Sequence, residues 1–323
     1  MTDRALQVVL ASVAIPTALF GYLALVEAIL RLMPQRQRPR ARPWLWLAPA
    51  LGFLGVFLVL PLLNTIVLSL LDAASRRFVG LDNFGALLGN PVMQIAARNS
   101  VVWLVLLTAI TVGLGLVMAV LVDRVRFERA AKAILFMPLA MSFVAAGVIW
   151  KFMFDYRPPG SPQTGTLNAA VTAFGGTPQP WLVDSPTNTG ALILATAWMF
   201  TGFCLVILSA GLKGLPGELL EAARIDGATE WQVFRRIIVP LLGPTIAVVT
   251  TTMAITALKA FDIVYVMTNG NYDTDVIGTA MYKALFSTRD FGQASAIAVV
   301  LLVAVLPFIA WNLRVFRRQE AIR

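Results

Sequence analysis

The chain has 323 residues, of which 58% are hydrophobic and only 13% charged, a composition that excludes a soluble globular domain. It has no histidine and a single cysteine, Cys204, which excludes a disulfide framework, a thiolate metal site and histidine-based proton transfer. The formal charge of +9 could suggest nucleic acid, but in so apolar a chain it indicates orientation in a lipid bilayer, and no nucleic-acid partner is expected.

Apolar runs that approach or exceed 20 residues recur along the whole chain. At 1.5 Å per residue, each can cross a hydrocarbon layer of about 30 Å as a helix. The sequence therefore predicts an all-α polytopic membrane protein with about seven transmembrane helices. We expect the spans at residues 6–32, 44–71, 99–122, 132–154, 189–211, 240–267 and 293–314.

The first span has an alternative interpretation as a signal peptide, because "ASVA" at 11–14 resembles a small-residue cleavage site. The apolar run continues to Leu32, however, far beyond a typical signal-peptide core, and ends in an arginine-rich segment. We interpret it as a retained extra helix, with Glu27 reaching the interface from its inner end. Residues 1–43 then form this helix and a basic cytoplasmic loop, residues 44–318 a six-helix core, and residues 319–323 a cytoplasmic tail.

The basic residues alternate between predicted loops. If the segment after the fifth span is cytoplasmic, most of the 26 Lys and Arg residues lie on that side, and this bias predicts an outside N-terminus and an inside C-terminus. Deleting or adding one span would destroy the alternation. The basic residues assigned to the inside lie within 31–42, 124–132, 213–236 and 314–323.

Two predicted outside segments are long enough to fold. In residues 72–98, Asp82 is placed to cap a short helix. Residues 156–188 are rich in Pro, Gly and Thr, with a short apolar helix signal at 167–174, as in an ordered extracytoplasmic loop.

The inside segment "GELLEAARIDGATEWQVFRRIIVP" at 217–240 predicts two short helices. Pro216 suits the first turn of one helix, and Gly227 suits the left-handed position that ends it. Thr229 and Gln232 form a capping-box pair for a second helix that begins at about 230 and runs into the sixth span. These two helices could form a docking element for a partner protein, or they could be an ordinary solvated loop with capped helices. Composition alone does not exclude the second interpretation.

The order of residues in this segment resembles the EAA loop of ABC importer permeases. Glu221-Ala222-Ala223, three residues, Gly227, nine residues, then Ile237 and Pro240 follow that pattern, with Val239 where the family has Leu. The resemblance covers roughly residues 44–318. "LKAFDIVYVMTNG" at 258–270 and "ILFMPLAMSFVAAGVIWKFMFDYRPPG" at 134–160 are similar to the carbohydrate permeases, especially the α-glucoside subgroup.

The resemblance implies a type I ABC importer permease fold in a bacterial or archaeal inner membrane, with coupling helices at 216–236. It implies a second homologous permease subunit, two cytosolic ABC ATPase subunits, an extracytoplasmic solute-binding protein and a sugar substrate. ATP and Mg²⁺ would be bound by the ATPase subunits, since this sequence has no G-x-x-x-x-G-K-[ST] motif, and no cofactor or metal is expected in the chain itself. The residues that would contact the ATPase are Glu221, Ala222, Ala223, Arg224, Asp226 and Gly227.

Polar side chains in the sixth span are candidates for the substrate pathway, because such residues usually face a cavity or the bundle interior. In a continuous helix, Asp262, Tyr265 and Asn269 share one face with Leu258. Asp262 and Asn269 could accept hydrogen bonds from sugar hydroxyls, and Phe261 or Tyr265 could stack on a sugar ring; Lys259 could instead neutralise Asp262. Secondary candidates are Asn99, Trp150, Trp198 and Thr201.

Other classes of function fit less well. A stand-alone ion-coupled transporter would rely on deep carboxylates, histidines or internal repeats, of which the sequence offers few or none. An intramembrane enzyme would need a nucleophile with a base at depth, and neither Cys204 nor Ser209 has such a partner in sequence. Within the permease class, an amino acid, a polyamine or a phosphate ester remains an alternative cargo to a sugar.

Overall fold

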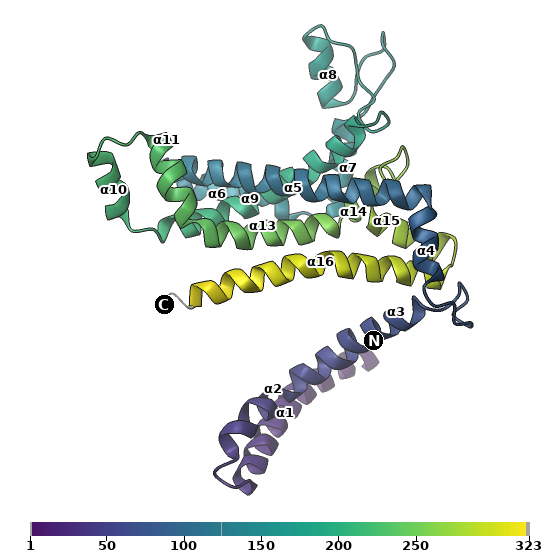
Figure 1. Ribbon diagram of the computed structural model, residues 1–323, viewed down its shortest axis with the longest axis vertical. Coiled ribbons are helices and arrows are strands. Elements are labelled where there is room, and N and C mark those ends of the chain that lie inside the picture. The colour runs from purple at the N-terminus through teal and green to yellow at the C-terminus, as the bar shows by residue number, and fades with distance from the viewer. Residues whose placement is uncertain (1, 124, 321–323) are drawn as a thin grey trace. The chain divides into compact units, whose positions relative to one another are not determined.

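The computed structural model describes residues 2–123 and 125–320, and its elements over these residues are helices, apart from one β-bridge between Leu71 and Phe78 (Figure 1). The described part contains six helices long and apolar enough to cross a membrane, or seven if one bent pair counts as a span. The all-α prediction with about seven spans is thereby confirmed. Arg124 and residues 321–323, assigned to a basic loop and the tail, lie outside the described residues.

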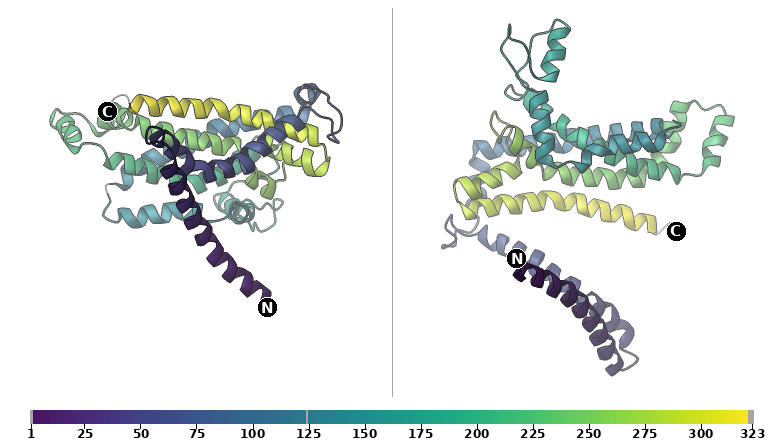
Figure 2. Two further views of the ribbon diagram at one scale, coloured as in Figure 1. Left: turned by 90° about the horizontal axis from the view of Figure 1, so that it is seen from below. Right: turned by 180° about the vertical axis from the view of Figure 1, so that it is seen from behind.

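The chain divides into two compact units, Met1–Asn64 and Thr65–Arg323. This division falls inside the second predicted span, whereas the sequence placed a boundary after residue 43; the predicted domain limits remain predictions. The first unit is a helical hairpin of α1 (Thr2–Leu32) and α2 (Arg38–Leu54), seen from two further sides in Figure 2. The Tyr22 hydroxyl joins the two helices by donating to the carbonyl of Leu45.

A π-helical turn, η1 (Gly55–Val59), continues α2 into α3 (Leu60–Leu68), so that one helical run extends over Arg38–Leu68. In the second unit, α4 (Asp82–Gly89) precedes the long helix α5 (Pro91–Val122). Asp82 is the first residue of α4 and Leu81 occupies the cap position without a side-chain bond, so the predicted helix exists but the predicted cap does not. Asp82 instead places its carboxylate in the first turn, where the helix dipole favours it.

The core of the second unit lies between α5 and α9 (Thr187–Lys213), which run side by side with α13 (Gly243–Leu258) and α16 (Phe291–Glu320) (Figure 1). Gly115 of α5 fixes the closest approach: a Cβ built there would lie 2.6 Å from the Cβ of Cys204 on α9. Cys204 is fully buried at this contact. The single cysteine therefore has a packing role at the helix crossing.

The fourth predicted span is not a straight helix. It comprises α6 (Glu128–Phe136), the 3-10 turn η2 (Met137–Ala140) and α7 (Phe143–Met153). The first part, Glu128–Ala140, meets the second part, α7, at an angle of 98°. Pro138 lies in the 3-10 turn, and the Ser142 hydroxyl accepts the N–H of Ala145 at 3.1 Å, which starts a new helix after the bend. The expectation of one continuous helix over 132–154 is therefore wrong.

After α7 the chain forms a small projecting subdomain around α8 (Thr166–Ala173), close to the helix predicted at 167–174 (Figure 1). Asn168 is buried there and its amide donates to the carbonyls of Asp155 and Gln179, at 2.9 and 3.0 Å. These bonds tie both ends of the loop to one side chain. The predicted ordered loop is thus present.

The other end of the long helices carries α10 (Gly217–Ile225) and α11 (Glu230–Val233), while α4 and α15 (Ile277–Tyr282) lie at the opposite end (Figure 1). A π-helical stretch η3 (Phe234–Ile238) and the short α12 (Val239–Leu241) lead from α11 into α13. A further π turn, η4 (Lys283–Ser287), follows α15. The second helix of the predicted pair therefore does run toward the sixth span.

Candidate functional site

The sixth span is interrupted at its polar part. α13 ends at Leu258 and α14 (Asp262–Met267) begins three residues later, with Phe261 at φ −148° and ψ −60°, outside helical geometry. Asn269 lies beyond the end of α14 with φ +54°. The prediction that Leu258, Asp262, Tyr265 and Asn269 share one helix face is therefore wrong, because no single helix carries them all.

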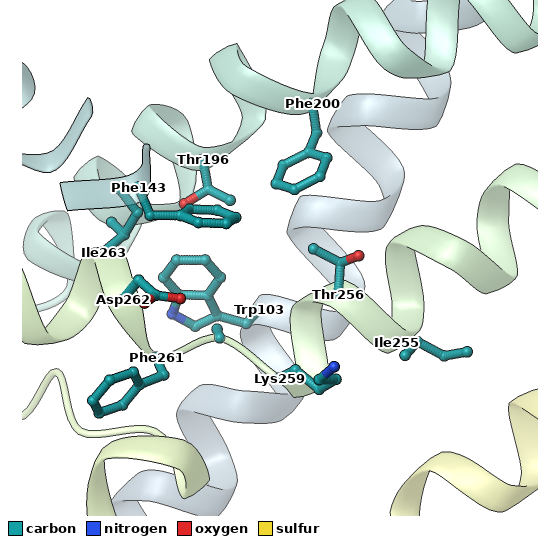
Figure 3. A pocket seen from close by; sticks show the side chains of 11 residues that line it. Trp103, Phe143, Thr196, Phe200, Ile255, Thr256, Lys259, Phe261, Asp262 and Ile263 are labelled. Atoms are coloured by element: carbon teal, nitrogen blue, oxygen red, sulfur yellow. The ribbon is translucent and has the colours of Figure 1, made fainter. Parts of the chain in front are cut away.

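A cavity of about 290 Å³ lies at this interruption (Figure 3). Its walls come from α5, α7, α9, α13, α14 and the segment between the last two. Figure 3 shows Phe143, Thr196 and Phe200 on one side, Lys259 and Phe261 on the other, and Trp103 between them. Non-helical backbone at membrane depth occurs where it is buried in protein or lines a water-filled cavity. The interruption of the sixth span is therefore tolerated because its residues line this cavity.

Three of the sequence-predicted residues lie at this cavity: Lys259, Phe261 and Asp262. Lys259 and Asp262 are both exposed, and neither has an ion-pair partner within 4.0 Å among the described residues. The predicted mutual neutralisation of the two side chains is thus not observed. The cavity instead presents one cation, one anion and two threonine hydroxyls, Thr196 and Thr256, beside aromatic rings.

Trp103 is a wall residue that the sequence did not single out. Its side chain is 1% exposed, and its indole Nε1 is buried without a hydrogen-bond partner among the described residues. A buried donor without an acceptor is destabilising by about 1–3 kcal/mol, so an unpaired one at a cavity wall indicates a site that a ligand could complete. No sequence signal distinguished it, because Trp103 lies near the start of the predicted span 99–122, where tryptophan is a usual interfacial anchor.

Tyr265 and Asn269 do not line this cavity. The ring of Tyr265 stacks on Phe261 with centroids 5.2 Å apart and meets Tyr282 edge-on at 5.0 Å. Phe286 continues this series of rings from Tyr282 at 4.7 Å. Tyr265 therefore extends the aromatic surface of Phe261 away from the cavity, through residues on α15 and η4 that the sequence did not indicate.

Asn99 also lies elsewhere. It is 3% exposed, and its amide donates to the carbonyls of Asp273 and Asp275 at 2.6 and 2.8 Å. These carbonyls belong to a turn-rich segment in which Asn269, Tyr272 and Asp273 all have positive φ. Asn99 thus fastens this segment to α5. Its side-chain amide donates to these two carbonyls and does not face the cavity.

Trp198 and Thr201 line a second cavity, of about 360 Å³, between α5, α6, α7 and α9. Trp198 meets Trp150 edge-on with centroids 5.7 Å apart, and both rings line this cavity. The Thr201 hydroxyl donates to the carbonyl of Ala197 on its own helix at 2.6 Å. These secondary candidates are therefore grouped together, but apart from Asp262.

The predicted coupling segment has the expected local structure. Gly227 has φ +82°, the left-handed conformation expected after α10, and the reciprocal capping box of Thr229 and Gln232 begins α11. Pro216 is the N-cap residue of α10 rather than part of its first turn. Arg224 donates to Glu230 at 2.8 Å, which bridges the two helices and raises the pKa of Arg224 above its usual value.

α10 has one face against the protein and one face in the open. Leu220 and Ala223 pack on a cluster formed by Leu212, Val233, Ile238 and Leu242. The opposite face of α10 is exposed and includes Leu219 at 48% and Ile225 at 86%. That face carries Glu218, Leu219, Glu221, Ala222 and Ile225. Ala223, which the sequence places among the ATPase contacts, is therefore half-buried against this cluster, and the sequence did not single out the exposed apolar residues Leu219 and Ile225.

The family profile described as "Binding-protein-dependent transport system inner membrane component" matches residues 111–320, which include the cavity residues after Trp103 and both helices of the coupling segment. The chain belongs to this family. It is accordingly a transport permease of the inner-membrane, multi-pass type.

Named relatives resemble the permease over most of its length. It is 52% identical over 279 residues to the osmoprotective compounds uptake permease protein GgtC of Synechocystis, covering 86% of this chain and 100% of the relative. It is 45% identical over 280 residues to the alpha-glucoside transport system permease protein AglF of Rhizobium meliloti, covering 86% and 83%.

A solved structure also matches the permease fold. The crystal structure of a bacterial alginate ABC transporter, in complex with its alginate pentasaccharide-bound periplasmic protein, contains a chain with a TM-score of 0.72 to this one. The sequences are 25% identical, and the match covers 85% of this chain and 96% of that chain. The predicted ABC importer permease fold is thereby confirmed.

Proposed function

We propose that this permease is a transmembrane subunit of an ATP-driven importer that translocates a sugar, an α-glucoside or another oligosaccharide, delivered by an extracytoplasmic solute-binding protein. It works with a second homologous permease and two cytosolic ABC ATPase subunits. ATP and Mg²⁺ are bound by those ATPase subunits, and the permease itself catalyses no reaction.

The cavity at the interruption of the sixth span is the observation that supports a sugar most directly. A pyranose ring has apolar C–H faces and a rim of hydroxyls, and it suits a site that combines aromatic faces with a few convergent polar groups. Phe143, Phe200 and Phe261 supply the faces, and Lys259 supplies a donor. Asp262 and the hydroxyl oxygens of Thr196 and Thr256 supply acceptors, since those two hydroxyls donate to the carbonyls of Leu192 and Thr252 on their own helices. The names of the two relatives, for osmoprotective compounds and alpha-glucosides, agree with this chemistry.

The size of the cavity favours a short stretch of sugar at any one time. Its volume of about 290 Å³ lies at the lower end of the range for small-molecule sites, roughly 300–1,000 Å³. We infer that one sugar ring is held in this subunit, and that the remainder of an oligosaccharide contacts the second permease.

The free face of α10 supports contact with an ATPase subunit. Leu219, Ala222 and Ile225 form an apolar strip on a short helix outside the predicted spans, with Glu218 and Glu221 beside it. Such a strip suits the helix-in-groove mode of recognition. Glu221, Ala222, Arg224, Asp226 and Gly227 remain the residues that we propose at or beside this contact, with Ala223 supporting it from beneath.

The orientation of the chain follows from its basic residues. The ATPase subunits would lie on the side of the membrane where α10 lies, and Arg235 and Arg236 lie on that side too. Because successive spans cross the membrane in alternate directions, the arginines around the α1–α2 turn and at the end of α16 lie on the same side. We therefore infer an outside N-terminus and an inside C-terminus, with α8 and its loop facing the binding protein.

Reconstitution of the four-subunit complex into proteoliposomes, with ATP inside and the cognate binding protein outside, tests the proposal. We expect uptake of one or more labelled members of a panel of α-glucosides, trehalose and polyols, and no uptake when the ATPase subunits are omitted. Uptake of an amino acid, a polyamine or a phosphate ester in preference to every sugar would refute the sugar assignment. Uptake by the permease alone, driven by an ion gradient, would refute the importer class.

A further inference from the structure

The turn between α1 and α2 concentrates positive charge. Residues 31–42 contain five arginines, and the sequence has no acidic residue between Glu27 and Asp72. Arg31 lies 3.8 Å from Glu27, the last acidic residue before the turn in the sequence. The turn therefore has an excess of positive charge that its own neighbours do not balance.

One of the remaining arginines has a structural task. Arg38 donates from Nε to the carbonyl of Met33 and from Nη2 to the carbonyl of Arg31, both at 2.9 Å, and thereby satisfies carbonyls at the end of α1. Arg36 and Arg40 differ from it. Both are exposed, and neither guanidinium group has a hydrogen bond or ion pair to another described residue.

Arg36 and Arg40 line the same hollow. A cavity of about 670 Å³ at the turn is bounded by Met33, Arg36, Gln37, Arg40, Ala41 and Trp44. Trp44 is 69% exposed and lies at the start of the apolar part of α2. The hollow therefore has a charged side formed by two guanidinium groups and an apolar side formed by an indole ring and Met33.

The position of the hollow along the helices sets the depth of any ligand. α1 and the run Arg38–Leu68 are both candidate membrane spans, and α2 has no buried residue, so the hairpin presents apolar side chains to lipid up to the turn. Arginine beside an exposed tryptophan at a span end marks the headgroup layer. Orientation in the bilayer requires net charge at this end, but it does not require two unpaired arginines around one cavity.

We propose that this turn binds an anionic phospholipid, whose phosphate lies between Arg36 and Arg40 and whose glycerol and first acyl carbons pack against Trp44 and Met33. Guanidinium groups bind phosphate oxygens through paired hydrogen bonds, and basic pockets at span ends are suited to anionic headgroups. The hairpin is thus a lipid-contact element of the permease, independent of which solute is transported.

Native mass spectrometry of the full-length permease with added phosphatidylglycerol or phosphatidylcholine tests the site. We expect the wild-type protein to bind phosphatidylglycerol more tightly than phosphatidylcholine. The double variant R36Q/R40Q should bind phosphatidylglycerol about 30-fold more weakly, equivalent to about 2 kcal/mol. The matched control R76Q/R77Q removes two exposed arginines from the segment after α3 and should bind like the wild type.

Several outcomes would overturn the site. Equal affinity for the two lipids, or an equal loss of phosphatidylglycerol affinity in the two double variants, would show that Arg36 and Arg40 do not form a specific lipid site. Displacement of the lipid by inorganic phosphate at millimolar concentration would identify a free-anion site instead. A photoactivatable phosphatidylglycerol on the wild-type protein needs no variant to insert correctly: labelling of residues 33–44 supports the proposal, and labelling confined to other segments refutes it.

Discussion

Trp103 forms part of the cavity wall, but it could not be identified as a site residue from the sequence. Within an apolar span, a tryptophan is indistinguishable from core packing, and only the fold reveals that its indole N–H has no acceptor in the described part of the chain. Asp262 was found because a carboxylate within a span is costly and therefore informative. Asn99 carried the same signal, but its amide fastens the segment after α14.

Replacing Trp103 with Phe keeps an aromatic wall and removes the unpaired donor. If the indole donates to a sugar hydroxyl during translocation, the loss of one hydrogen bond, worth about 1 kcal/mol, should lower uptake at saturating loaded binding protein about fivefold. ATP hydrolysis without substrate should not change. Proteoliposome uptake and phosphate release measure the two quantities.

Trp150 provides a matched control for this variant. Its Nε1 is also buried without a partner among the described residues, but it lines the second cavity. W150F should leave uptake within about twofold of the wild type. If the two variants lose uptake equally, the effect is one of packing, and Trp103 does not contact the sugar.

Gly227 was predictable because its requirement is local. Its φ of +82° disfavours any side chain, and a built Cβ meets nothing within 4 Å, so a substitution there acts on the backbone alone. G227V should disturb the angle between α10 and α11 and abolish the stimulation of ATP hydrolysis by loaded binding protein, while membrane insertion is retained. In contrast, G160V, at φ +90° and equally open, should insert and bind the ATPase subunits normally. Normal stimulation in G227V would contradict the coupling role.

At the scale of elements, the helices with local signals were predicted well. The capping box, the end of α10 and the short α8 depend on nearby residues. The 98° bend between η2 and α7 and the interruption before Asp262 were not predicted. Hydropathy reports how many apolar residues a segment has, but it does not report the direction in which the helix axis runs. The direction is set by tertiary packing, here the contact of α7 with α14.

The free face of α10 predicts the result of an element-level experiment. If Ile225 enters an apolar groove of the ATPase, burying it contributes roughly 1.5–3 kcal/mol, and I225N should weaken binding of the permease to the ATPase subunits at least tenfold. Co-purification at graded concentrations measures this affinity. Phe174 is even more exposed, at 93%, but lies after α8, so F174N should not change ATPase binding. Unchanged binding of I225N would remove this face from the proposed interface.

At the scale of the whole molecule, the class, the number of spans and the family could be predicted from the sequence, because each is repeated over many residues. The substrate pathway could be predicted only in part. Three predicted residues meet at one cavity, but the remaining wall comes from α5, α7 and α9, and no single-sequence signal indicates which faces of those helices converge.

The orientation of the chain can be tested by cysteine labelling. In a C204A background, S161C in the loop before α8 should react with a membrane-impermeant maleimide in intact cells. Q35C in the turn before α2 should react only after permeabilisation. The reverse pattern would invert the proposed topology, and reaction of both in intact cells would indicate an even number of crossings between them.

The interruptions of the fourth and sixth spans have a mechanical consequence. α7 packs on α14, whereas α6 packs on α9, so the half-spans beyond the two breaks are joined to each other more closely than to their own continuations. Residues 259–261 do not carry a regular helical hydrogen-bond ladder between α13 and α14. The α7–α14 contact consequently joins the fourth and sixth spans beyond both interruptions, beside the cavity that Phe143 and Asp262 line.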